Sequence, residues 1–210
     1  PSNPTSKSQR HGYEEMKRLG ILASHRGTNF QAIIDACKEG RLDAEPVVAI
    51  SNNSKSVALC RAREAGIATV HLSNATHPGC DKLDNAILDA LLGHQVDLVI
   101  TAGYMKKLGP RTLAHYSGRI INVHPSLLPK YGGKGMFGLN VHEAVINSGD
   151  KETGISIHWI DGDYDTGPVI SQQVIAVLPD DTPETLAKRV LASEHQLLIE
   201  TLANLLEQEQ

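Results

Sequence analysis

Short apolar runs alternate with longer helix-like segments over the first 125 residues of this chain, and this alternation constrains the fold most strongly. The apolar runs are typical of buried strands and cover residues 19–23, 46–50, 68–72, 96–102 and 119–123. The intervening segments that have the length and periodicity of helices are 28–39, 55–65 and 81–93. Strands separated by helices form βαβ units, and the strands of such units pair in parallel.

A second pattern follows Pro125, because two β-like runs, 153–160 and 167–177, flank the turn-forming sequence DGDYDT. A final helix is expected over 182–207, with Thr182 as its cap and Pro183 in its first turn. The sequence therefore predicts an α/β fold: a Rossmann-like, mostly parallel twisted sheet with helices on both faces, a late β-hairpin and a C-terminal helix. We expect a flexible N-terminal tail at residues 1–17 and a single domain at 18–210.

Composition excludes several classes of function. The net charge of −4 gives no basic face for nucleic acid, and no apolar run is as long as a membrane span. Cys37, Cys60 and Cys80 form no CxxC pair, which indicates reduced thiols in a cytoplasmic protein rather than a disulfide or metal site.

Polar side chains gather where predicted strands end. Asn122 and His124 lie two residues apart in INVHPSLLP and should share one face, directed into the ligand crevice of the sheet. An amide donor beside an imidazole can stabilise an oxyanion and move a proton. The alternative is a histidine that pairs with a backbone carbonyl and an asparagine that caps a turn. Asp165, in DGDYDTGPVI, belongs either to a solvated turn or to a carboxylate that reaches back to the histidine.

The stretch LASHRGTNFQ turns from a strand through residues 27–29 into a helix. The free N–H groups at a helix start suit an anion, so this loop is a candidate anion site.

These motifs together resemble the phosphoribosylglycinamide formyltransferase family. The matching segments, in the family's order, are GTNFQAIIDA, AGYMKKL, NVHPSLLPKYGG, DTGPVI and RVLASEHQLL, within Leu19 to Leu206. HPSLLP alone is shared with other formyltransferases. The resemblance implies transfer of the formyl group of the co-substrate 10-formyltetrahydrofolate to the amine of glycinamide ribonucleotide (N1-(5-phospho-D-ribosyl)glycinamide). The products are formylglycinamide ribonucleotide and tetrahydrofolate, in de novo purine biosynthesis. It implies no metal, small-molecule partners only, and a monomer or homodimer.

The resemblance also assigns roles to individual residues. The family's catalytic asparagine, histidine and aspartate fall on Asn122, His124 and Asp165. The positions expected to bind the ribonucleotide are Gly27, Thr28, Asn29, Gly103, Met105, Pro125 and Glu194. The positions expected to line the folate cleft are Lys106, Lys107, Leu108, Ile121, Asp161, Gly162, Asp163 and Tyr164.

The sequence departs from the family pattern at both ends of the ribonucleotide site. His25 and Arg26 replace a glycine and an asparagine in the first loop, and Leu191 stands where relatives carry lysine or glutamine. We hypothesise that Arg26 binds the phosphate in place of that missing partner, with Lys188 as the alternative. The segment 132–140 is longer than in the family.

Three other functions remain open at this point. An amino-sugar formyltransferase shares the catalytic residues, and a 10-formyltetrahydrofolate hydrolase uses the same co-substrate. A folate- or nucleotide-binding protein without catalysis belongs to a different class. Incubation with the folate, with and without glycinamide ribonucleotide, distinguishes them.

Overall fold

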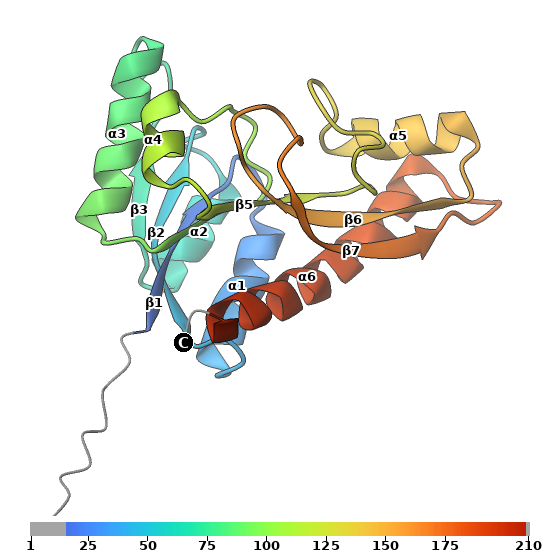
Figure 1. Cartoon of the computed structure of the whole chain (residues 1–210), viewed down its shortest axis with the longest axis horizontal. Coiled ribbons are helices and arrows are strands. Elements are labelled where there is room, and N and C mark those ends of the chain that lie inside the picture. The colour runs from blue at the N-terminus through green and yellow to red at the C-terminus, as the bar shows by residue number, and fades with distance from the viewer. Residues whose placement is uncertain (1–15, 209–210) are drawn as a thin grey trace, which may run out of the picture.

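The computed structural model describes residues 16–208, which contain one seven-stranded sheet (Figure 1). Its strands are β1 (Lys17–Leu22), β2 (Ala44–Ser51), β3 (Ala68–His71), β4 (Leu98–Thr101), β5 (Ile120–His124), β6 (Glu152–Trp159) and β7 (Val169–Ala176). They lie in the order β3-β2-β1-β4-β5-β6-β7; the first five are parallel, and β6 and β7 are antiparallel to their neighbours. The predicted α/β fold is confirmed, including the late hairpin. The predicted tail lies outside the described residues except for Met16 and Lys17, and Lys17 already belongs to β1.

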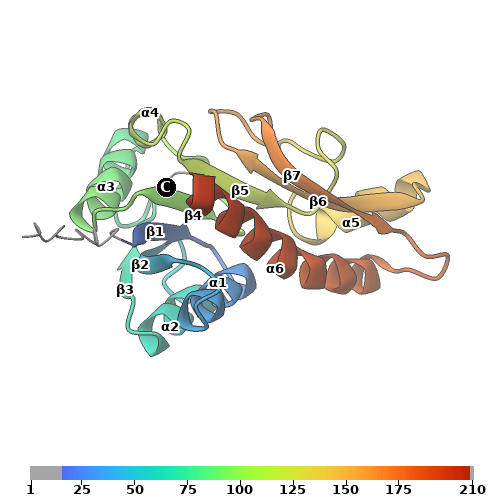
Figure 2. The same ribbon diagram turned by 60° about the horizontal axis from the view of Figure 1, so that its bottom comes forward.

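Helices cover both faces of the sheet (Figure 2). They are α1 (Thr28–Lys38), α2 (Val57–Glu64), α3 (Cys80–Gly93), α4 (Pro110–His115), α5 (Leu139–Ser148) and α6 (Pro183–Gln208). One core cluster joins the sheet to α1, α2 and α6, and the other joins it to α3. At the start of α6, Thr182 and Thr185 exchange side-chain to backbone hydrogen bonds, so the predicted cap is confirmed.

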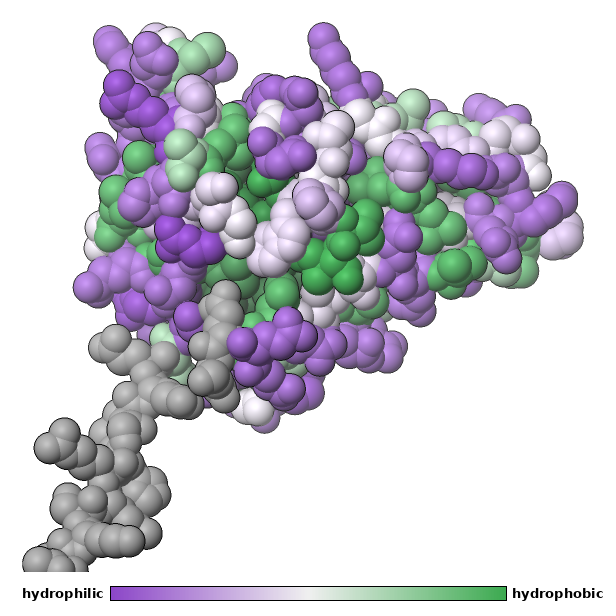
Figure 3. Space-filling model, viewed as in Figure 1, coloured by the Kyte–Doolittle hydropathy of each residue, from purple (hydrophilic) through white to green (hydrophobic). Residues whose placement is uncertain are grey.

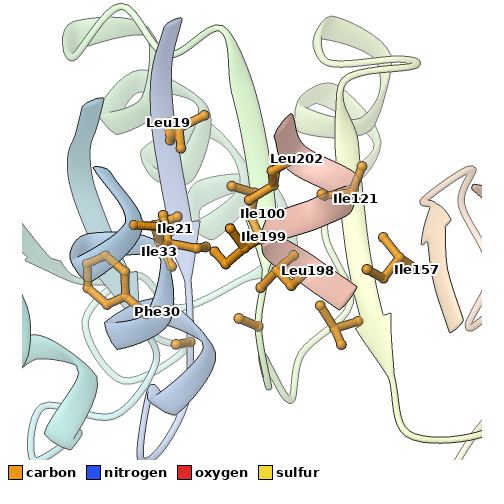
Figure 4. Close-up of a cluster of buried hydrophobic side chains, with 14 of the residues drawn as sticks. Leu19, Ile21, Phe30, Ile33, Ile100, Ile121, Ile157, Leu198, Ile199 and Leu202 are labelled. Carbon is orange, nitrogen blue, oxygen red and sulfur yellow. The ribbon is translucent and has the colours of Figure 1, made fainter. Parts of the chain in front are cut away.

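The α6 face of the sheet holds the larger core (Figure 4). Ile21 and Ile100 project from β1 and β4 toward α6, whose Leu198 and Leu202 are fully buried against them. Each such side chain stabilises the fold by roughly 1.5–3 kcal/mol relative to an exposed one. This packing fixes α6 across the sheet, and with it the side chains that α6 presents at the carboxyl ends of the strands.

Two groups of polar contacts hold the loops at that edge. Ser24, after β1, accepts a hydrogen bond from Met105 N–H at 2.8 Å, and its own N–H donates to Gly103 O at 3.0 Å. Asp84 of α3 caps α4 from outside by accepting from the N–H groups of Arg111 and Thr112 at 2.8 and 3.0 Å. The loops that follow β1 and β4 are therefore tied to each other and to the helix layer.

Candidate functional site

The end of β5 presents Asn122 in one fixed orientation. Thr101 Oγ1 donates to Asn122 Oδ1 at 2.8 Å, and Asn122 Nδ2 lies 3.1 Å from His158 Nε2. His158 Nδ1 lies 2.9 Å from the Trp159 carbonyl, which can only accept a hydrogen bond. The neutral His158 ring therefore carries its proton on Nδ1, and Nε2 accepts from the Asn122 amide. The second amide hydrogen of Asn122 makes only a long contact with Asp165 Oδ1, at 3.5 Å, so a ligand can compete for it.

His124 lies two residues further along β5 and is only 4% exposed. Its Nε2 donates to the Tyr131 carbonyl at 2.8 Å, and its Nδ1 lies 3.5 Å from Asp165 Oδ1. Burial lowers the pKa of His124 below its ordinary value, and the Asp165 charge and the Tyr131 carbonyl offset part of that shift. The ring is thus held neutral near pH 7, with Nδ1 as the nitrogen that can take a proton.

Asp165 closes this polar group from the β6–β7 loop. Its Oδ1 lies 3.5 Å from His124 Nδ1, His158 Nε2 and Asn122 Nδ2, and its Oδ2 accepts from Gly133 N–H at 2.9 Å. Burial raises the pKa of Asp165, but the attraction of its carboxylate to His158 and His124 when those rings are protonated, together with the Gly133 N–H, outweighs burial and lowers the pKa overall. Asp165 therefore remains ionised beside His124.

The structure brings all three predicted catalytic residues together and adds His158, which the sequence interpretation missed. His158 lies directly opposite Asn122 in the antiparallel β5–β6 register. The alternation in ISIHWI places His158 on one face of a strand, but only the antiparallel pairing puts that face beside Asn122.

The loop after β1 has the geometry of an anion site. Gly27 adopts the left-handed conformation at φ 64°, and α1 begins at the next residue. The first helical hydrogen bond runs from Gln31 N–H to Gly27 O at 2.9 Å, so the N–H groups of Thr28 and Asn29 have no partner within the helix. Arg26 is exposed beside them, and its carbonyl accepts from Arg61 Nε at 2.9 Å.

A buried pair joins this loop to α6. Asn29 Nδ2 donates to Glu194 Oε2 at 2.9 Å, and each residue is only 8% exposed. Burial raises the pKa of Glu194, and the hydrogen bond from Asn29 offsets part of the shift. Glu194 ends a stripe along α6 that faces the same cleft: Glu184, Ala187, Lys188, Leu191 and Glu194. Lys188, the alternative phosphate partner, thus lies one turn from Leu191.

All of these groups border one cleft of about 1200 Å³. Of the expected ribonucleotide and folate positions, those that line it are Gly27, Thr28, Asn29, Gly103, Met105, Lys106, Lys107, Leu108, Pro125, Gly162, Asp163, Tyr164 and Glu194. The long segment after β5 contributes residues 133–139 to the wall. In the space-filling view, apolar surface in the middle of the molecule is framed by hydrophilic side chains (Figure 3). The cleft is larger than the roughly 300–1,000 Å³ typical of a pocket for one small ligand.

Two of the expected folate positions lie elsewhere. Ile121 is fully buried in the core on the α6 side of the sheet, because residues alternate along β5 and Ile121 faces away from Asn122. Asp161 accepts from the Thr166 hydroxyl at 2.9 Å and lines a separate small cavity beside Trp159. On the cleft itself, Lys107 forms a 2.8 Å ion pair with Asp163 and lies 5.9 Å from the centre of the Tyr164 ring.

Neither a metal cluster nor a membrane helix is found in residues 16–208. No three His, Cys, Asp or Glu side chains there are grouped as metal ligands, and none of the helices is long and apolar enough to cross a membrane.

The chain belongs to the formyl transferase family, whose sequence pattern it matches over residues 17–202. It is similar to proteins described as phosphoribosylglycinamide formyltransferase. The chloroplastic protein of Arabidopsis thaliana is 36% identical over 91% of this chain and 66% of its own length. The Haemophilus influenzae protein is 37% identical over 87% of this chain and 84% of its own length.

A solved structure gives the same result. Glycinamide ribonucleotide transformylase 1 from Geobacillus kaustophilus superposes with a TM-score of 0.85 at 38% identity, covering 91% of this chain and 99% of that chain. The family resemblance inferred from the motifs is confirmed. This chain spans less than two thirds of the length of the Arabidopsis relative.

Proposed function

We propose that this protein transfers the formyl group of 10-formyltetrahydrofolate to the amine of glycinamide ribonucleotide. The observation that carries this proposal is the position of Asn122, His124 and Asp165 within a cleft whose wall includes the Gly27–Asn29 anion loop. The names of relatives that match most of this chain support the choice of substrates.

The chemistry follows from the atoms that are free to react. The substrate amine attacks the formyl carbon, and the formyl oxygen becomes an oxyanion. The Asn122 amide hydrogen that makes only the long contact with Asp165 donates to that oxyanion instead, and His124 donates as well once its Nδ1 is protonated. Asp165 stabilises the protonated ring and relays the amine proton, directly or through water, until it reaches N10 of tetrahydrofolate as the C–N10 bond breaks.

We propose that the 5′-phosphate binds at the start of α1. The free N–H groups of Thr28 and Asn29 and the positive end of the helix favour a dianion there, and Arg26 adds a charge beside them. The Asn29–Glu194 pair fits the ribose hydroxyls, because the carboxylate accepts hydrogen bonds where the phosphate loop meets α6. The folate is expected along Lys106, Lys107 and Leu108, opposite Gly162–Tyr164. No metal ion is invoked in any step.

The Arg26 contact is testable with a matched control. Arg26→Ala should raise KM for the ribonucleotide and leave kcat nearly unchanged, because the phosphate does not react. A charge-assisted hydrogen bond is worth about 1.5–3 kcal/mol, and the exposure of Arg26 favours the lower end, so we expect a rise of roughly tenfold. Added salt should weaken wild-type binding more than binding by the variant. If Lys188→Ala gives the rise and Arg26→Ala does not, Lys188 is the phosphate partner.

Formyl transfer itself is measured by folate absorbance with and without glycinamide ribonucleotide. Consumption of 10-formyltetrahydrofolate that requires the ribonucleotide supports the proposal. Consumption with formate release in its absence indicates the hydrolase, and transfer to an amino sugar alone indicates the sugar enzyme. Binding of either ligand without turnover indicates the non-catalytic alternative.

We further propose a cytoplasmic enzyme of purine biosynthesis that acts as a monomer or homodimer. The three free thiols, two of them exposed, suit a reducing compartment.

A further inference from the structure

A short turn after β5 contacts both members of the His124–Asp165 pair. The Tyr131 carbonyl accepts from His124 Nε2 at 2.8 Å. Two residues later, Gly133 N–H donates to Asp165 Oδ2 at 2.9 Å. The position of this one turn therefore determines the orientation of the imidazole and of the carboxylate together.

The turn has a backbone conformation that it does not adopt without support. Tyr131 lies in the left-handed region at φ 54°, which is uncommon for a residue with a side chain. The Ser126 hydroxyl donates to the Lys130 carbonyl at 2.6 Å and fixes the residue before it. The Lys130 N–H also donates to the Leu127 carbonyl at 3.0 Å, and the Tyr131 side chain adds a support outside the turn.

The phenol of Tyr131 is anchored away from the cleft. Its oxygen lies 2.8 Å from Asp150 Oδ2 and 2.6 Å from Ser148 Oγ, at the end of α5. The ring packs against the α6-side core rather than lining the cleft. The hydrogen bond from Tyr131 is also the main reason that the pKa of Asp150 is lowered. Tyr131 thus joins the end of α5 to the turn without reaching the expected substrate positions.

We propose that Tyr131 is a positioning residue for formyl transfer: its phenol, held by Asp150 and Ser148, fixes the turn whose carbonyl and following N–H orient His124 and Asp165. This inference rests on the proposed function. It has a direct chemical consequence for His124. A carbonyl only accepts hydrogen bonds, so the proton of the neutral ring stays on Nε2, and Nδ1 remains free toward Asp165.

The test removes the anchor and keeps the ring. Tyr131→Phe should lower kcat by roughly tenfold, less than the 10²- to 10⁴-fold effect of losing a general acid–base group, and should change KM less than twofold. Asp150→Ala should have the same effect, and the double variant should lose little more. Lys130→Ala is the matched control, because Lys130 is exposed and its Nζ binds the same Asp150 carboxylate at 3.1 Å, while the backbone carbonyl held by Ser126 is retained. It should leave kcat unchanged.

A readout independent of turnover is the tautomer of His124, that is, which ring nitrogen carries the proton of the neutral ring. Nitrogen-15 NMR of labelled protein should show the Nε2–H form of His124 in the wild type and in Lys130→Ala. Tyr131→Phe and Asp150→Ala should show a mixture of the two neutral forms. A wild type that transfers no formyl group refutes the proposed function but leaves this measurement valid.

Three outcomes would overturn the inference. One is wild-type kcat and a wild-type His124 spectrum in Tyr131→Phe. Another is an equal loss of kcat in Lys130→Ala. The third is a loss of kcat in Tyr131→Phe that is fully explained by a smaller fraction of folded protein, with the His124 NMR spectrum unchanged. If Tyr131→Phe does not fold, Asp150→Asn provides the same comparison.

Discussion

Gly27 joins the fold to the proposed phosphate site, and its replacement tests that link. Gly27 has φ 64° directly before α1. A Cβ atom added there would lie 2.6 Å from Ala58 Cβ and 2.9 Å from Ala58 Cα on α2. Gly27→Ala therefore imposes both left-handed strain and a steric overlap, and the turn that starts α1 must move.

The expected cost follows from these two terms. A left-handed alanine costs about 1–2 kcal/mol and overpacking typically adds about 1–3 kcal/mol, so unfolding free energy should fall by roughly 2–5 kcal/mol. Ala58→Gly alone should lower the unfolding free energy by at most about 1 kcal/mol, because glycine is a weaker helix former than alanine by about that amount. The double variant removes the Cβ–Cβ overlap but not the approach to the Ala58 backbone. Its loss of unfolding free energy should be smaller than the summed losses of the two single variants by at least about 1 kcal/mol.

Urea unfolding of the four proteins at one pH measures this coupling. KM for glycinamide ribonucleotide should rise in Gly27→Ala, because the N–H groups of Thr28 and Asn29 are displaced, and should partly recover in the double variant. Additive stability changes, within about 0.5 kcal/mol, would refute the reasoning. So would an unchanged KM in a destabilised Gly27→Ala protein.

Three further predictions concern charge in the cleft. Burial lowers the pKa of His142 to about 4, so the folded state resists its protonation and wild-type stability should decline as pH falls from about 6.5 to about 4. Urea unfolding of His142→Leu at several pH values should lack this part of the decline in unfolding free energy. The same pH dependence of unfolding free energy in both proteins would contradict this role of His142. Asp165→Asn should lower the pKa of His124 further in an NMR titration, because the carboxylate raises it, and an unshifted titration would argue against contact. Glu194→Ala should weaken ribonucleotide binding but not folate binding in calorimetry; equal weakening would indicate a packing role instead.

The parallel half of the fold could be predicted because its apolar runs and helical periods are local features of the sequence. Helix α4 could not, because its cap is Asp84 on another helix rather than a neighbouring side chain. Helix α5 was missed as well: it follows a glycine-rich segment, and its own first position is preceded by Gly138 without a side-chain cap.

The candidate site shows the same limit. Asn122 and His124 were predictable from their spacing of two along a strand. His158 depends on antiparallel register, which spacing does not give. The contact of Tyr131 with His124 uses a backbone carbonyl, which every residue has, and depends on a left-handed conformation with no sequence marker.

The most direct test of the central proposal follows the formyl carbon itself. Protein in excess is mixed with 10-formyltetrahydrofolate labelled with carbon-13 in the formyl group and with glycinamide ribonucleotide, and the product is read by NMR. The proposal predicts that the label appears as the formamide carbon of formylglycinamide ribonucleotide, with one tetrahydrofolate formed for each product and no such transfer by His124→Ala on the same timescale. Label recovered as formate, or left on the folate while the ribonucleotide is bound, would contradict it.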